Sequence, residues 1–156
     1  MNINKQKPKI LVVEDDKRQS DLLIELINDT GLYDLIPAYN GKQAFSCLKA
    51  NRRGFNFLTN KIACVLLDWQ MPEMNGEQFL TQLRKQETRI PFKRFLPIIV
   101  LSAYSDKERW QLATNPSLGM ASSYFVKPFD EISLINILYR IVYQKEAEIL
   151  REMLGE

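Results

Sequence analysis

Apolar residues along this chain follow two patterns that alternate from the N-terminus onward. Short apolar runs, such as KILVV at residues 9–13 and IACVLL at residues 62–67, are typical of strands buried on both faces. Between the runs, apolar residues recur at the spacing of an amphipathic helix. The runs predict strands at residues 9–13, 33–39, 62–67, 96–101 and 123–126, and the spacing predicts helices at residues 16–30, 42–50, 76–86, 106–113 and from 130 onward.

Five strands in strict alternation with five helices predict an α/β fold, a parallel sheet that has helices on both faces. Pro37 lies within the second predicted strand. That strand should lie at an edge, because proline has no N–H to give to a sheet ladder. Three connections are long, at residues 51–60, 87–95 and 114–122. We interpret them as loops inserted at the surface, with partner-binding surfaces as the alternative.

The composition is that of an ordinary globular protein. With 156 residues, of which 46% are hydrophobic and 26% charged, the chain is expected to form one domain with a sizeable core. The net charge of +2 is too small to indicate nucleic acid or an anionic membrane as a partner. We interpret two basic groups as solvated surface charge: Lys5, Lys7 and Lys9, and then Arg84, Lys85, Arg89, Lys93 and Arg94.

The numbers of cysteines and histidines limit the kinds of site and of catalysis that this chain can have. The two cysteines, Cys47 and Cys64, do not make a disulfide framework, and we interpret them as small buried apolar residues. No secretory signal is visible and no apolar run reaches the ~20 residues of a membrane span, so a reducing cytoplasm is expected. The chain contains no histidine, which excludes histidine zinc sites, Ser-His-Asp or Cys-His catalysis and a histidine phospho-carrier.

Charged and hydroxyl side chains follow four of the predicted strands. The carboxyl ends of parallel strands meet at one edge of a sheet, where functional groups gather. Two carboxylates about 4 Å apart repel by roughly 4 kcal/mol at an effective dielectric near 20, so a compensating charge is needed. A divalent cation that prefers oxygen ligands, such as Mg²⁺, would supply it. The residues at these strand ends are Glu14, Asp15 and Asp16, then Asp68, Ser102 and Lys127.

This arrangement favours phosphoryl transfer. A carboxylate can act as the nucleophile and form an aspartyl phosphate, helped by positioning and by charge neutralisation from a metal and a lysine. Asp68 is the strongest candidate because it stands alone on a central strand. Lys127 would pair with a phosphoryl oxygen, and Ser102 would donate a hydrogen bond. We interpret Asp16 as the N-cap of the first helix, with an outer role at the metal as the alternative.

Four motifs carry a resemblance to a known family: ILVVEDD at residues 10–16, LLDWQMPEMNG at 66–76, IVLSA at 99–103 and YFVKPF at 124–129. Because the motifs occur in this order, residues 9–143 resemble the receiver domain of two-component response regulators, of which the chemotaxis regulators are an example. The resemblance implies a flavodoxin-like fold, a doubly wound parallel sheet of five strands in the order 2-1-3-4-5, with five helices.

The resemblance also implies roles around the phosphoacceptor, which would be Asp68. Mg²⁺ (or Mn²⁺) would be held by Glu14, Asp15 and Asp68, together with the backbone carbonyl of Gln70. In this family, the residues at the positions of Gln70 and Tyr104 tune the access of hydrolytic water. The bulk of Tyr104 therefore predicts a long-lived phosphoryl group.

Further roles follow from the other motifs. The resemblance implies that Ser102 is a switch hydroxyl and that Tyr124 is an aromatic switch that turns inward with it. Lys127 would pair with the phosphoryl group, and its bond to Pro128 would be cis, an isomer open to X–Pro bonds at modest cost. We interpret Trp69 as a partly exposed aromatic at the rim of the site.

The implied function is a response regulator receiver domain in phosphorelay signalling. Asp68 would accept a phosphoryl group from a phosphohistidine of a sensor kinase or a histidine phosphotransfer protein. The domain would catalyse only its own phosphorylation and dephosphorylation, so it is not expected to be an enzyme in the usual sense. Phosphorylation would then switch a protein–protein interaction surface.

Other classes of protein share parts of this pattern. Phosphatases of the haloacid-dehalogenase type need a second carboxylate two residues after the nucleophile, where this chain has Gln70. A flavin or nucleotide binder is disfavoured, because no Gly-rich loop follows the first strand. A pseudo-receiver that docks partners without phosphorylation is the alternative that stays open.

The chain is expected to divide into an N-terminal arm (1–8), the receiver domain (9–143) and a C-terminal helical extension (144–156). We predict that the extension pairs with another copy or begins a signalling helix of a longer protein. A homodimer through the face of the fourth helix, fifth strand and fifth helix is the other possibility. No DNA-binding motif follows, so neither direct nucleic acid binding nor a membrane is expected. The extension carries an apolar stripe made by Ile149, Leu150, Met153 and Leu154.

Overall fold

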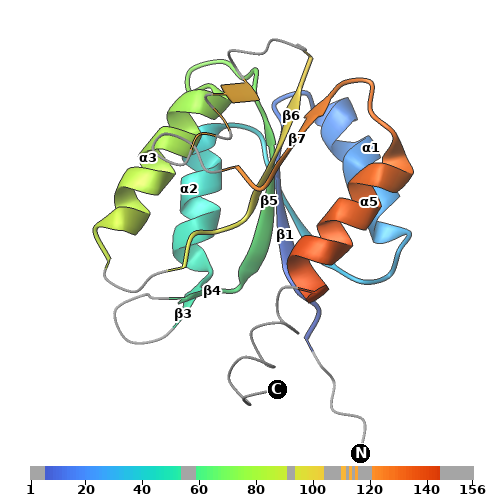
Figure 1. Cartoon of the computed structure of the whole chain (residues 1–156), viewed down its shortest axis with the longest axis horizontal. Coiled ribbons are helices and arrows are strands. Elements are labelled where there is room, and N and C mark those ends of the chain that lie inside the picture. Colours follow the sequence, from blue (N-terminus) through green and yellow to red (C-terminus); the bar gives the residue numbers. More distant parts are fainter. Residues whose placement is uncertain are drawn as a thin grey trace, which may run out of the picture.

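The fold is a five-stranded parallel sheet with helices on both faces (Figure 1). The computed structural model describes residues 6–53, 59–90, 94–103, 110–111, 113, 115 and 121–144. The strand order is β2-β1-β5-β6-β7, the predicted order 2-1-3-4-5 in terms of the five strands of this sheet. These strands are β1 (Lys9–Val13), β2 (Asp34–Ala38), β5 (Ile62–Asp68), β6 (Ile98–Ser102) and β7 (Ser123–Val126).

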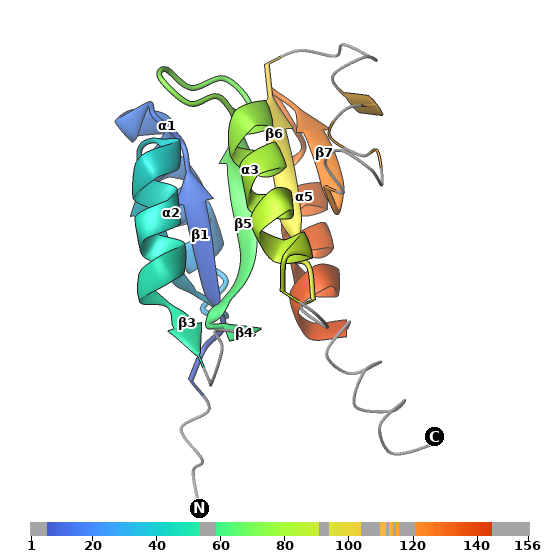
Figure 2. The ribbon, with the colours of Figure 1, turned by 90° about the vertical axis from the view of Figure 1, so that its left-hand side faces the viewer.

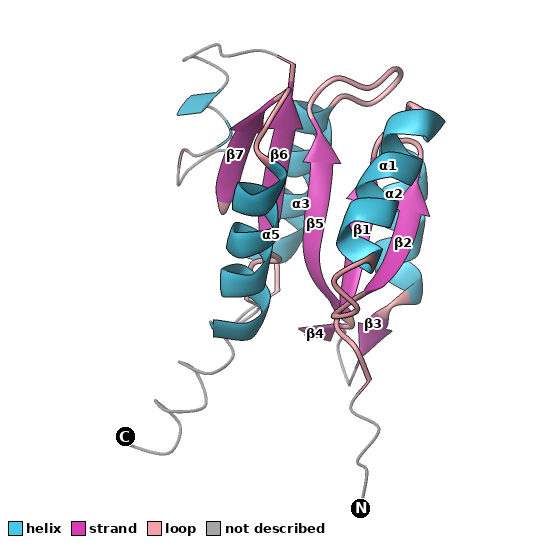
Figure 3. Ribbon diagram, turned by 90° about the vertical axis from the view of Figure 1, so that its right-hand side faces the viewer, coloured by secondary structure: helices cyan, strands magenta, loops and turns pink. Residues whose placement is uncertain are grey.

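The helices cover the two faces in pairs. Figure 3 shows α1 (Lys17–Asn28) and α5 (Glu131–Tyr139) on one face, and Figure 2 shows α2 (Gly41–Ala50) and α3 (Gly76–Thr88) on the other. The pi-helical turn η2 (Arg140–Gln144) continues α5. Of the predicted helix at residues 106–113, the described residues 110, 111 and 113 are helical and the others lie outside the described part. The predicted extension lies outside it from residue 145 onward.

Each of these four helices begins at an aspartate or asparagine that caps it. The cap side chain accepts a hydrogen bond from a backbone N–H one turn later and so satisfies a donor that the helix leaves unpaired. At α3 the cap is a full capping box, because the Gln78 side chain also accepts from the backbone of Asn75. The four caps are Asp16, Asn40, Asn75 and Asp130, so the predicted cap at Asp16 is confirmed.

The core has two layers because successive strand residues point to opposite faces of the sheet. In β1, Leu11 and Val13 pack toward α2 and α3, whereas Ile10 and Val12 pack toward α1 and α5. All four side chains are buried, as a strand covered on both faces requires. The other central strands, β5 and β6, follow the same alternation and form a rigid platform for the residues at their ends.

The connection after α2 differs from the prediction. Residues 51–60 were expected to form a loop, but β3 (Arg52–Arg53) and β4 (Thr59–Asn60) pair as a short antiparallel ribbon. The Asn60 side chain donates to the Leu48 carbonyl (3.0 Å), which ties the ribbon to the end of α2. Figure 2 places the ribbon at the amino ends of the strands, away from their carboxyl ends.

A second correction concerns Arg84, which was expected to be solvated surface charge. Its side chain is buried and donates to the Glu87 carboxylate at 2.6 Å. The other oxygen of Glu87 accepts from the backbone N–H of Leu96 at 2.8 Å. The guanidinium also lies over the Phe95 ring, 5.5 Å from its centroid, so the end of α3 is fixed to the chain that enters β6.

Candidate functional site

The backbone carries four chain segments to one edge of the sheet. Three hydrogen bonds extend the ladder just beyond the strands: Glu14 to the Ala38 carbonyl (3.0 Å), Trp69 to the Leu101 carbonyl (2.8 Å) and Lys127 to the Ser102 carbonyl (2.7 Å). These bonds fix the first residue after β1, β5 and β7. The side chains of Glu14, Asp68 and Lys127 therefore start from rigid positions.

Three carboxylates meet at this edge. One oxygen from each of Glu14, Asp15 and Asp68 lies within 4.8 Å of the others. Glu14 and Asp68 are buried, with 1% and 5% of their surface exposed, whereas Asp15 is exposed. The convergence predicted from the strand ends is therefore present, and it opens to solvent on the Asp15 side.

Lys127 is the cation that faces this cluster. Its ammonium nitrogen lies 2.8 Å from Glu14 Oε2 and 3.3 Å from Asp68 Oδ1. It also lies 3.0 Å from the side-chain oxygen of Gln19, which comes from the first turn of α1. Gln19 was not predicted as a site residue, because the contact joins the first turn of α1 to a lysine 108 residues further along the chain.

The environment changes the pKa of Glu14, Asp68 and Lys127. Burial raises the pKa of Glu14, although the hydrogen bond from Lys127 opposes the change. Burial also raises the pKa of Asp68, against the charge of Lys127. For Lys127, burial lowers the pKa, but the hydrogen bond to Glu14 and the charges of Asp68 and Glu14 outweigh it and raise the pKa overall. One ammonium thus compensates the buried carboxylates only in part, and a further cation would favour their ionised forms.

The chain after Asp68 turns away from the site through a close backbone approach. The Gly76 N–H donates to the Trp69 carbonyl at 3.0 Å. A Cβ at Gly76 would lie 2.7 Å from the Trp69 Cα and 2.8 Å from the Asp68 carbonyl oxygen. Glycine is required here because neither backbone atom can move aside.

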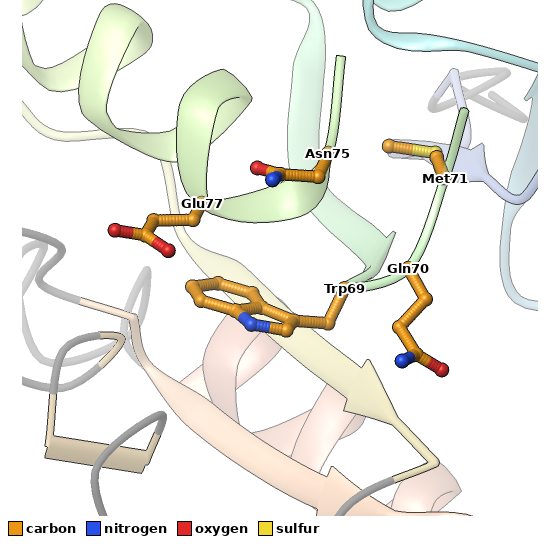
Figure 4. A pocket seen from close by; sticks show the side chains of 5 residues that line it. All are labelled: Trp69, Gln70, Met71, Asn75 and Glu77. Atoms are coloured by element: carbon orange, nitrogen blue, oxygen red, sulfur yellow. The ribbon is translucent and has the colours of Figure 1, made fainter. Parts of the chain in front are cut away.

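Beside the phosphoacceptor candidate, the same turn forms a hollow of about 460 Å³. In Figure 4 the Trp69 indole lies beside Glu77, while the Gln70 side chain points the other way. Trp69 is only 5% exposed, so the expectation of a partly exposed rim aromatic is wrong. The indole packs into the core cluster against α3 and helps to hold the turn in place. The hollow is lined by Trp69, Gln70, Met71, Asn75 and Glu77.

Two other predicted residues lie on the neighbouring strands. Ser102 is the last residue of β6 and is fully buried. Tyr124 lies in β7, half-buried against the core cluster that also contains Val100, its neighbour in the sheet. The Lys127–Pro128 peptide bond is cis, as the resemblance implied. Tyr104 lies outside the described residues.

The donor set fits a small divalent cation. It consists of carboxylate oxygens, two of them buried, with one exposed member that leaves a path from solvent. Magnesium is typically bound through one or two carboxylates, waters and a phosphate oxygen. The backbone of Gln70, two residues after Asp68, donates a hydrogen bond to the Asp68 carboxylate and so lies close to the cluster. The residues present can therefore hold Mg²⁺ without any rearrangement of the sheet.

Comparison with known proteins agrees with this site. The model of the response regulator receiver domain family matches residues 10–139, which include all the described site residues. This chain belongs to that family. Receiver domains are signalling domains of two-component systems rather than ordinary enzymes. They bind Mg²⁺ at an acidic site and interact with sensor kinases or phosphotransfer proteins.

Individual relatives extend the match beyond the motifs. The transcriptional regulatory protein CrdR of Helicobacter pylori is 35% identical over 142 residues, which cover 91% of this chain and 58% of CrdR. An uncharacterised 14.6 kDa protein of Leptolyngbya boryana is 33% identical, over 88% of this chain and 94% of its own length. The receiver domain of the Francisella response regulator 1452 is 27% identical, with a TM-score of 0.69 over 89% of this chain and 99% of that domain.

The receiver domain spans about half the length of several curated relatives that it matches. Some of these relatives are named as transcriptional regulators, so the expectation that this chain itself does not touch nucleic acid stays a prediction. No helix in the described ranges combines the length and the apolar character needed to cross a membrane.

Proposed function

We propose that this receiver domain accepts a phosphoryl group on Asp68 from a phosphohistidine of a sensor kinase or a histidine phosphotransfer protein. A carboxylate oxygen of Asp68 attacks the phosphorus, a new O–P bond forms and the P–N bond of the donor breaks. The imidazole leaves as the neutral base once it has taken up a proton from solvent. The observation that supports this most directly is the meeting of Asp68 with Lys127 and two further carboxylates.

The other site residues have supporting roles in this proposal. Glu14, Asp15, Asp68 and the Gln70 carbonyl hold Mg²⁺ (or Mn²⁺), which when bound neutralises the charge of the incoming phosphoryl oxygens. Lys127 keeps Asp68 paired before the reaction and pairs with a phosphoryl oxygen after it. The buried position of Asp68 keeps bulk water away from the carboxylate that reacts.

The switch begins at Ser102 and Tyr124. The Ser102 hydroxyl is proposed to donate to the phosphoryl group, and the Tyr124 ring to turn inward with it. Ser102 ends β6 and Tyr124 lies in the adjacent edge strand β7, and the change is proposed to reach the face made by the fourth helix, the fifth strand of the sheet (β7) and α5. That surface would bind the output partner or a second copy. Phosphorylation would shift the population between two conformations of the domain and would not create a new fold.

Intact mass spectrometry after incubation with Mg²⁺ and acetyl phosphate tests the proposal. We expect one phosphoryl mass on the wild type and none on Asp68→Asn or after chelation of the metal. A wild type that gains no mass would refute the phosphoacceptor and favour a docking module that acts without phosphorylation. Asp34→Asn, an exposed acid at the amino end of β2, serves as the matched control and should be phosphorylated as the wild type is.

Two finer proposals follow from the same site. Gln70 and Tyr104 are proposed to limit the access of hydrolytic water, so Tyr104→Ala should shorten the lifetime of the phosphoryl group, measured by mass after removal of the donor.

We also propose that the chain consists of an N-terminal arm (1–8), the receiver domain (9–143) and a helical extension (144–156). Light scattering of the full chain and of residues 1–143 tests the extension as a dimer contact, which two monomers would refute.

A further inference from the structure

The Lys127 ammonium has three N–H donors and three acceptors around it. Two of the acceptors, Glu14 Oε2 and Asp68 Oδ1, belong to carboxylates proposed to hold the metal. The third is the side-chain oxygen of Gln19, at 3.0 Å. Gln19 is thus the partner of Lys127 whose oxygen is not proposed to bind the cation or to carry the phosphoryl group.

Gln19 is held in place by the residues around it. Its backbone N–H donates to Asp16 Oδ1 at 3.0 Å, and the backbone N–H of Asp16 donates to Glu14 Oε1 at 3.3 Å. Glu14 Oε2 accepts from Lys127, and Lys127 donates to Gln19. Four hydrogen bonds therefore close a ring through Glu14, Asp16, Gln19 and Lys127. The ring joins the first turn of α1 to the segment after β7, 108 residues further along the chain.

We infer that Gln19 is a positioning residue, which keeps the Lys127 ammonium next to Asp68 when the carboxylate oxygens turn to a cation and a phosphoryl group. A neutral amide oxygen suits this role. It orients the ammonium through a hydrogen bond from an exposed position on α1, where a carboxylate oxygen can accept the same bond. This inference rests on the proposed function, because it concerns how the same lysine is presented.

Substitution of the side chain separates positioning from folding. Gln19→Met keeps the length of an exposed helical side chain but removes the acceptor, whereas Gln19→Glu keeps an acceptor oxygen at the same distance from the backbone. Gln43→Met is the matched control. Gln43 is the same residue at the same position of α2, and its side chain accepts from Tyr39 away from the site.

At saturating Mg²⁺, we expect Gln19→Met to slow phosphorylation by acetyl phosphate about threefold to tenfold, in line with the ordinary net value of one hydrogen bond at an exposed position. Gln19→Glu should stay within about twofold of the wild type, and Gln43→Met should match it. Equal rates for Gln19→Met and the wild type would overturn the inference, as would an equal loss in Gln19→Glu.

A second readout does not depend on the reaction. In protein labelled with ¹³C at the lysine ε-carbon, the two ε-protons of Lys127, assigned with Lys127→Arg, should be inequivalent in the wild type at saturating Mg²⁺. They should become equivalent in Gln19→Met but not in Gln43→Met. Inequivalent protons in Gln19→Met would contradict the positioning role. Failure of the wild type to be phosphorylated would instead refute the proposed function, and this spectrum would still test Gln19.

Discussion

Two ion pairs at opposite ends of this receiver domain are built differently, and one is buried while the other is partly exposed at its lysine. At the end of α3, Arg84 and Glu87 form a balanced pair in which both Glu87 oxygens are bound, one by the guanidinium and the other by the Leu96 N–H. At the carboxyl ends of the strands, Lys127 faces three carboxylates, and Asp15 among them is exposed.

The two ion pairs differ in how completely their carboxylate charges are compensated. The Arg84–Glu87 pair satisfies its acceptors and is closed to solvent, so nothing is gained by exchanging a partner. The Lys127 cluster has more negative than positive charge, and burial raises the pKa of both Glu14 and Asp68. A buried charge that is fully paired holds the structure together, whereas a surplus of carboxylates marks a place prepared for a cation.

The largest effect is expected from Glu87→Ala. This change leaves the Arg84 guanidinium buried without its carboxylate and the Leu96 N–H without its acceptor. Breaking a buried pair in this way costs about 3–5 kcal/mol. Urea unfolding should show this loss, with or without Mg²⁺. Lys85→Ala, an exposed change in the same turn, should shift the free energy of unfolding by less than about 0.5 kcal/mol. A small loss in Glu87→Ala would mean that the pair is not structural.

A smaller and conditional loss is expected from Lys127→Met. It removes the ammonium from the cluster of Glu14, Asp15 and Asp68, and we expect about 2 kcal/mol of destabilisation in EDTA. Mg²⁺ stabilises every variant that keeps the metal site, by about 2.7 kcal/mol at 100 times its Kd. It should stabilise Lys127→Met more than the wild type, because it supplies the positive charge that this variant lacks. Thermal melts with EDTA and with Mg²⁺ measure the gain of each variant. Glu87→Ala keeps the metal site and should gain only as much as the wild type, and an equal gain in all three proteins would mean that the two ion pairs do not differ as described.

The smallest effect has the opposite sign. Asp68→Asn should stabilise the metal-free protein by about 1 kcal/mol, because it removes a buried charge that is only partly compensated. Since the folded-state pKa of Asp68 is raised, the wild type loses stability as pH rises from the ordinary carboxyl value near 4 through the raised pKa. The gain in Asp68→Asn should therefore be absent near pH 4 and complete at neutral pH. Unfolding curves across this range would contradict the idea if the gain were constant.

Much of the fold could be predicted because its signals are periodic and local. Unbroken apolar runs identified the strands of the main sheet, and Pro37 identified the edge strand β2. The acidic ends of β1 and β5 and the lysine after β7 predicted which residues would meet. All of these signals lie within single segments of the chain, where the hydrophobic pattern and the residue types can be examined together.

The features that were missed depend on contacts between segments. The ribbon of β3 and β4 has strands of two residues, too short for any period. Arg84 looks like surface charge until Glu87 and Phe95 are seen around it. Gln19 meets Lys127 through side chains that start 108 residues apart in the chain. The burial of Trp69 likewise depends on the packing of α3 over the turn.

Pro37 has a consequence for how copies of this protein can associate. It lies in β2, opposite Val12 of β1, on the outermost strand of the sheet. A strand added by another molecule would lack one N–H at the fourth position of the five-residue edge. The sheet is therefore protected against growth into fibrils from this side, and a functional assembly is directed toward contacts made by helices and side chains.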